Sequence, residues 1–75
     1  MKQPRILNAL LKEAEANREK ALTSIELLTE HPAGIGDHST EYYYKNAREA
    51  VEALAEANEM IETIKSYLKS KKSVL

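Results

Sequence analysis

The positions of the prolines and glycines constrain this sequence more than any other feature. The chain has 75 residues but only two of each, and three of these four lie between residues 32 and 36. Because Pro and Gly interrupt regular structure, the segments on either side can each form one long element. Both segments are rich in Ala, Leu, Glu and Lys, which favour helices. We predict an all-α fold with a helix over about 4–30, with Pro4 in its first turn, a loop over about 31–38 and a helix over about 39–70.

Apolar residues recur at alternating spacings of four and three along both segments, which is the pattern of a helix face that packs against another helix. We call these two rows the stripes. They comprise Leu7, Leu11, Ala14, Ala21, Ile25 and Leu28, interrupted by Arg18, in the first segment, and Tyr43, Ala47, Ala50, Leu54, Ala57, Ile61, Ile64 and Leu68 in the second. A short loop forces two such helices to lie antiparallel, so residues 1–75 are predicted to form a single helical hairpin domain.

Further apolar residues flank the stripes, and one partner helix does not cover them. They are Ile6, Leu10, Leu22 and Leu27 in the first segment and Ala53, Met60 and Tyr67 in the second. A chain this short buries only about 60% of the surface that its unfolded form exposes. It has no cysteine, so no disulfide can stabilise it. We predict a homo-oligomer, a dimer or higher, in which hairpins assemble into a helical bundle. A marginal monomer and a complex with another protein are the alternatives.

The predicted loop concentrates residue types that bind ligands. Two glycines two positions apart let backbone amides approach a ligand closely, and the start of the following helix offers unpaired amides and a positive dipole end. This combination is typical of anion sites. The three tyrosines just beyond the loop can stack on a base, namely Tyr42, Tyr43 and Tyr44, and Lys45 and Arg48 add positive charge. The candidate ligand-binding residues are Gly34, Gly36, His38, Ser39, Thr40, Tyr43 and Lys45.

The same loop can also be explained as a turn alone. Gly34 suits the end of the first helix, and Asp37, Ser39 or Thr40 suits the cap of the second. Glu41, in the first turn, opposes an anion there. A turn needs one glycine and one cap, however, and this loop adds both histidines and the only aspartate of the chain.

Catalysis and metal binding are not expected of this loop. Asp37, His38 and Ser39 are the residue types of a hydrolytic triad, but adjacent residues point in different directions and cannot form the required hydrogen-bonded chain. His31 and His38 with Asp37 have no specific metal-ligand spacing. We therefore predict no enzyme, no metal and no cofactor.

The segment from Pro32 to Ser39, Pro-Ala-Gly-Ile-Gly-Asp-His-Ser, resembles the Pro-x-Gly-Ile-Gly-(Asp/Glu)-His interhelical loop of short two-helix proteins of tailed phages. Most of these proteins have no assigned function. The resemblance covers nearly the whole chain in layout, although its specific part is these eight residues. It implies a small viral accessory protein in the host cytoplasm. Small helical oligomeric phage proteins include sponges that sequester nucleotides of host immune signalling, so the resemblance brings an anti-defence role under consideration.

Polar residues lie near the middle of both segments. Asn17 and Arg18 interrupt the apolar face of the first, and Asn58 lies at a matching height in an antiparallel hairpin. We interpret them as a polar layer that fixes the register of the helices. The alternative is that Arg18 binds an anion between subunits.

The net charge of −1 hides an uneven distribution. An antiparallel hairpin brings together seven basic residues and no acidic one at the end where the termini lie, which we call the basic end: Lys2, Arg5, Lys12, Lys65, Lys69, Lys71 and Lys72. This is either a solvated face or a surface for an anionic partner. Nucleic acid is not the expected partner, because the helices are too long for a helix-turn-helix reader.

Together these features predict a non-enzymatic protein that binds and sequesters a small anionic, nucleotide-like ligand, such as an immune second messenger of the host. The alternative is a protein–protein interaction module that binds and redirects a host protein through its helix faces. No apolar run approaches the roughly 20 residues that cross a bilayer, and no secretory signal is recognisable. We therefore expect a cytoplasmic protein that does not associate with a membrane.

Overall fold

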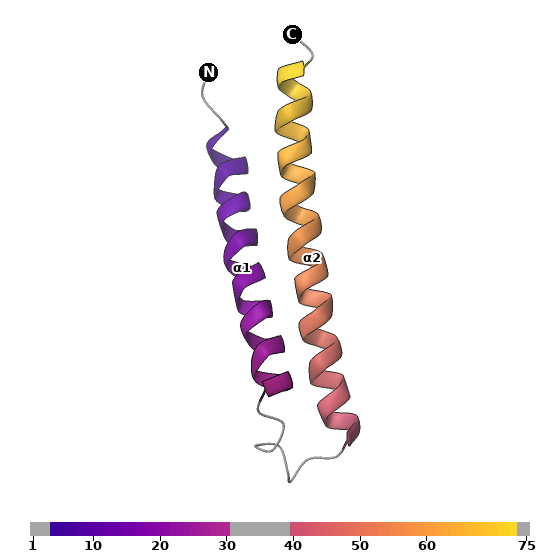
Figure 1. Cartoon of the computed structure of the whole chain (residues 1–75). Coiled ribbons are helices and arrows are strands. Elements are labelled where there is room, and N and C mark those ends of the chain that lie inside the picture. The colour runs from indigo at the N-terminus through magenta and orange to yellow at the C-terminus, as the bar shows by residue number, and fades with distance from the viewer. Residues whose placement is uncertain (1–3, 31–39, 74–75) are drawn as a thin grey trace.

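The computed structural model describes residues 4–30 and 40–73, and they form two helices. Helix α1 spans Arg5–Glu30 and helix α2 spans Thr40–Ser73. The two lie side by side and antiparallel, with both chain termini at one end (Figure 1). No strand occurs in the described ranges. The all-helical hairpin predicted from the sequence is confirmed for these residues.

The helix ends agree with the sequence to within a few residues. The Pro4 carbonyl accepts the hydrogen bond of the Asn8 amide at 3.0 Å, so Pro4 lies directly before Arg5, the first residue of α1, one residue earlier than the predicted first-turn position. Helix α2 begins at Thr40 and continues to Ser73, beyond the predicted end at Ser70. The predicted loop, residues 31–38, lies outside the described residues.

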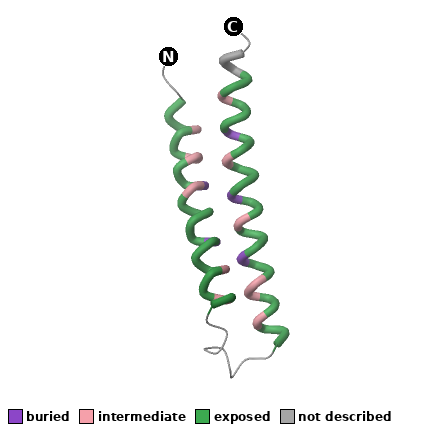
Figure 2. Tube along the Cα trace, in the orientation of Figure 1, coloured by how far each residue is buried: buried purple, intermediate pink, exposed green. Residues whose placement is uncertain are grey.

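The two stripes face each other along the hairpin. The buried apolar residues of the described ranges all belong to the stripes: Ala14, Ala21, Ala50, Ala57 and Ile64. The other stripe residues are half-buried, except Arg18, which is exposed. Figure 2 shows buried and half-buried positions on the side of each helix that faces the other. The core is therefore a narrow seam built mainly of alanine.

Several alanines of this seam lie opposite larger side chains. A hydrogen bond from Arg18 Nε to Asn58 Oδ1 at 3.1 Å joins the two helices and gives a reference point for their register. Counting outward from this contact along both helices brings Ala21 to within about one residue of the height of Leu54. The same count pairs Ala14 with Ile61 and Ala50 with Ile25. Small residues opposite large ones let antiparallel helices approach closely.

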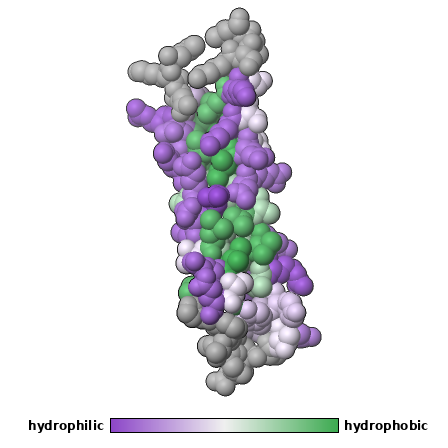
Figure 3. Space-filling view, viewed as in Figure 1, coloured by the Kyte–Doolittle hydropathy of each residue, from purple (hydrophilic) through white to green (hydrophobic). Residues whose placement is uncertain are grey.

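Many large apolar side chains stay outside the seam. Those that the structure leaves exposed are Ile6, Leu22, Leu27, Tyr42, Tyr44, Val51, Met60 and Tyr67. Figure 3 shows apolar side chains gathered along the length of one face, interrupted near its middle by hydrophilic ones. Neither α1 nor α2, over the residues described, contains a stretch long and apolar enough to span a bilayer.

Candidate functional site

The start of α2 holds the described part of the predicted ligand site. Thr40 is the first residue of this helix, and Lys45 follows just over one turn later. Both are exposed. The other candidate residues at the loop, Gly34, Gly36, His38 and Ser39, lie outside the described residues. The structure thus places two candidate side chains, a hydroxyl and an ammonium group, on the accessible surface of one helix end.

Tyr43, the third described candidate, is turned toward α1 instead. It is a half-buried stripe residue, and its hydroxyl donates a hydrogen bond to the Leu28 carbonyl. Leu28 lies in the last turn of α1, where carbonyls have no partner within their own helix. Tyr43 therefore joins the end of α1 to the start of α2. Its ring also makes an edge-on contact with Tyr44, with centroids 6.5 Å apart and planes at 78°.

The neighbouring tyrosines present more of their rings to solvent. Tyr42 is 46% exposed and Tyr44 is 63% exposed. Sequence reasoning grouped all three tyrosines as stacking candidates, but the stripe already distinguishes Tyr43, which occupies a position that faces the other helix. Glu41 lies in the same first turn and lowers the local positive potential.

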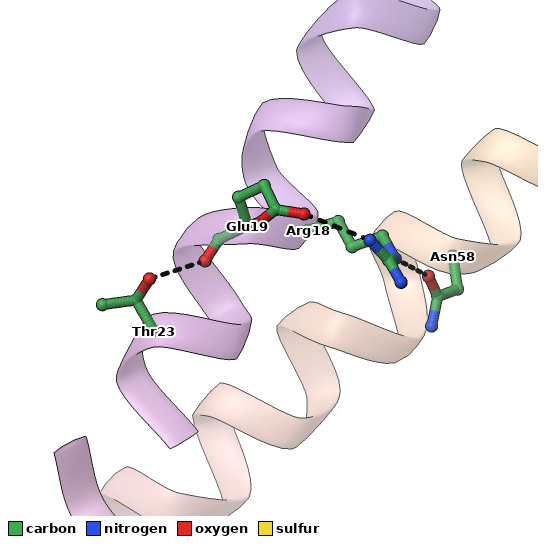
Figure 4. Close-up of polar contacts among 4 residues, drawn as sticks. All are labelled: Arg18, Glu19, Thr23 and Asn58. Carbon is green, nitrogen blue, oxygen red and sulfur yellow. Dashed lines mark hydrogen bonds and ion pairs between the residues drawn. The ribbon is translucent and has the colours of Figure 1, made fainter. Parts of the chain in front are cut away.

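A polar cluster lies near the middle of the hairpin (Figure 4). Besides its bond to Asn58, Arg18 makes an ion pair through Nη1 with Glu19 Oε2 at 3.2 Å. The Thr23 hydroxyl donates to the Glu19 backbone carbonyl at 2.9 Å. The Arg18 side chain is 44% exposed, so water screens this cluster. The structure places Arg18 and Asn58 at the matching height that the sequence predicted, whereas their role in fixing the register and the role of Arg18 as an anion ligand stay predictions.

An open groove of about 720 Å³ runs along one side of the seam, between α1 and α2. Alanines of both helices line it, namely Ala14, Ala21, Ala50, Ala53 and Ala57. Leu10, Leu27, Leu28 and Met60 add larger apolar surface, and Glu13, Asn17, Lys20, Ser24, Asn46, Glu49 and Glu56 add polar groups. The sequence indicated part of this groove lining, because Ala53 and Met60 form a row beside the stripe. An open groove lined by alanines is better suited to packing against another helix than to enclosing a small molecule.

Among the described residues, no group of three or more His, Cys, Asp or Glu side chains is arranged to hold a metal ion. Both histidines and Asp37 belong to the segment outside the described ranges. Comparison with protein-family models, with curated proteins and with solved structures finds no match for this chain.

Proposed function

We propose that this protein is a non-enzymatic, homo-oligomeric helical hairpin that binds and sequesters a small anionic, nucleotide-like ligand at the loop end of α2. The observation that supports this most is the accessible ring of Tyr42, which lies about one turn before Lys45 on the same helix face, with Thr40 at the start of that helix. Aromatic side chains stack on bases of any sequence, and an ammonium group attracts phosphate. A nucleotide requires both kinds of contact.

The helix start supplies a further contribution. The first four amides of α2 have no acceptor within the helix, and the helix dipole is positive there. Glu41 lies four residues before Lys45, so the two share a helix face and their charges offset each other. Stacking and amide hydrogen bonds therefore carry more of the proposed affinity than net charge does. The resemblance of the Pro32 to Ser39 segment to phage interhelical loops supports an immune second messenger of the host as the ligand class.

Calorimetry against a panel of cyclic and linear nucleotides tests this proposal. We expect at least one to bind, and we expect Lys45→Gln to weaken it by about tenfold, the cost of one charge-assisted contact. Glu52→Gln, which removes one charge at an exposed position on the outer face of α2, is the control and leaves the affinity unchanged. If none of the panel binds at high micromolar concentration, the ligand-binding proposal is wrong.

A second candidate function is an interaction module that binds and redirects a host protein. The observation that favours it is apolar exposure outside the seam, for example Ile6 at 71% and Val51 at 54%. A pull-down from host lysate should then retain a defined partner. Charge reversal on the outer face of α2, by Glu52→Lys with Glu59→Lys, should release it. If wild type and variant retain the same proteins, this candidate fails.

A further inference from the structure

We propose that the groove between α1 and α2 is a self-association surface, occupied by a second copy of this chain that runs antiparallel to the first. The two copies are related by a twofold axis that passes beside Asn17, which lines the groove near the middle of α1. This inference rests on the homo-oligomer part of the proposed function and adds the face and the orientation. It is independent of the ligand.

The hairpin exposes more surface than a compact monomer of the same mass. The chain exposes 6271 Å², whereas a compact monomer of its 8.5 kDa mass exposes about 4,700 Å². The excess is roughly 1,600 Å² per chain. A standard interface buries about 800 Å² on each partner, so a second copy packed along the hairpin fits the larger interfaces of obligate homodimers.

The shape of the groove suits a helix of the same kind. Its alanine lining removes side-chain bulk from both helices, so a partner backbone can come close. Leu10 and Met60 line the groove, and in the second copy the same two residues are the larger side chains that pack into the groove of the first. In a twofold arrangement the two copies use the same surface. The groove of each copy therefore receives the larger side chains of the other.

Charges along the groove can pair in the antiparallel orientation of the two copies. Glu13 and Lys20 both line it, and Asn17 lies between them. When α1 packs antiparallel on the α1 of the second copy about Asn17, each Glu13 faces the Lys20 of the other copy. This gives two reciprocal ion pairs on the rim of the interface.

The two ends of the hairpin support the same orientation. A parallel arrangement would place one basic end beside the other, with like charges at short range. The antiparallel arrangement instead places the basic end beside the loop end of the other copy. Among the described residues, that end carries four acidic residues, Glu26, Glu30, Glu41 and Glu49, against two basic ones, Lys45 and Arg48.

Cysteine trapping tests the face and the orientation in a chain that has no cysteine of its own. We expect oxidation of Asn17→Cys to convert most of the protein to a covalent dimer, because the axis brings the two side chains within disulfide reach. Glu52→Cys, on the outer face of α2, is the matched control and stays uncrosslinked. If Asn17→Cys forms no covalent dimer while light scattering shows an oligomer, the proposed face is wrong and the homo-oligomer stands. If the chain is monomeric, both proposals about assembly fail, and the calorimetry decides the ligand separately.

A charge swap provides a second, reversible test. We expect Glu13→Lys alone and Lys20→Glu alone each to weaken dimerisation by roughly tenfold, since two pairs are lost and like charges meet. The double variant Glu13→Lys/Lys20→Glu should restore it. If the double variant does not restore dimerisation, the antiparallel orientation is wrong.

Discussion

Arg18 occupies a stripe position of α1 that the pattern reserves for an apolar residue. Its Nε atom reaches Asn58 on α2 at 3.1 Å, and Ala57 precedes this partner in the opposing stripe. Stripes built of repeated alanine and leucine differ little from one heptad to the next, so apolar contacts alone define the register weakly. A polar contact at one height adds the missing specificity, as single polar residues do in coiled coils.

We expect Arg18 and Asn58 to be coupled energetically. A double-mutant cycle with Arg18→Ala and Asn58→Ala should give a coupling of about 0.5 kcal/mol, because the hydrogen bond is exposed and screened by water. Chemical denaturation at fixed protein concentration measures each variant. Strictly additive effects of the two substitutions would show that the contact contributes nothing to the hairpin.

The Tyr43 hydroxyl joins the start of α2 to the end of α1 by its hydrogen bond to the Leu28 carbonyl. Tyr43→Phe removes the donor to the Leu28 carbonyl and leaves that carbonyl without this partner, so we expect a loss of about 1 kcal/mol in the free energy of unfolding. Tyr44→Phe is the matched control, because Tyr44 is mostly exposed, and its effect should be within about 0.5 kcal/mol of zero. Equal effects of the two variants would contradict the assigned role of Tyr43.

At the scale of the helices, the spacing of apolar residues predicted the seam position by position. Every stripe residue other than Arg18 is buried or half-buried, because a repeat of three and four keeps residues on the face that meets the partner helix. The end of α2 was predicted less well. The prediction stopped shortly after Leu68, the last stripe residue, but the residues after Ser70 include neither Gly nor Pro, and the helix continues to Ser73.

The groove could not be predicted from the sequence alone. The flanking row of Ala53 and Met60 was recognisable, but its position beside Leu10 and Asn17 of α1 depends on how the two helices are rotated and aligned. Tyr43 shows the same limit at the candidate site. Its proximity to the loop suggested ligand contact, whereas its stripe position turns it toward Leu28.

The small residues of the seam should not tolerate enlargement. Ala21 is 4% exposed, so Ala21→Leu forces extra volume into a closely packed position and should destabilise the hairpin by about 1–3 kcal/mol. Ala16→Leu makes the same chemical change at an exposed position of α1 and should be nearly neutral. Thermal denaturation followed by circular dichroism distinguishes them. Similar melting of both variants would show that the seam is not closely packed.

At the scale of the whole molecule, the hairpin measures 58 × 16 × 15 Å, which is a rod with little interior. Its buried core in the described ranges is four alanines and Ile64, and alanine removes little apolar surface from water. Large side chains such as Leu27 and Met60 stay exposed. A second copy that covers them adds the burial that one chain lacks.

Stability should therefore depend on protein concentration. If folding is coupled to assembly, the melting temperature rises by several degrees when the concentration is raised a hundredfold, because mass action favours the oligomer. Circular dichroism at two such concentrations measures this shift. A melting temperature that does not move with concentration would indicate a hairpin that folds alone.

The mass of the folded protein in solution tests the central claim of assembly most directly. Sedimentation equilibrium at micromolar concentration should give at least twice the 8.5 kDa of one chain, with helical circular dichroism under the same conditions. A fully helical species of 8.5 kDa, unchanged as the concentration is raised, would contradict the account.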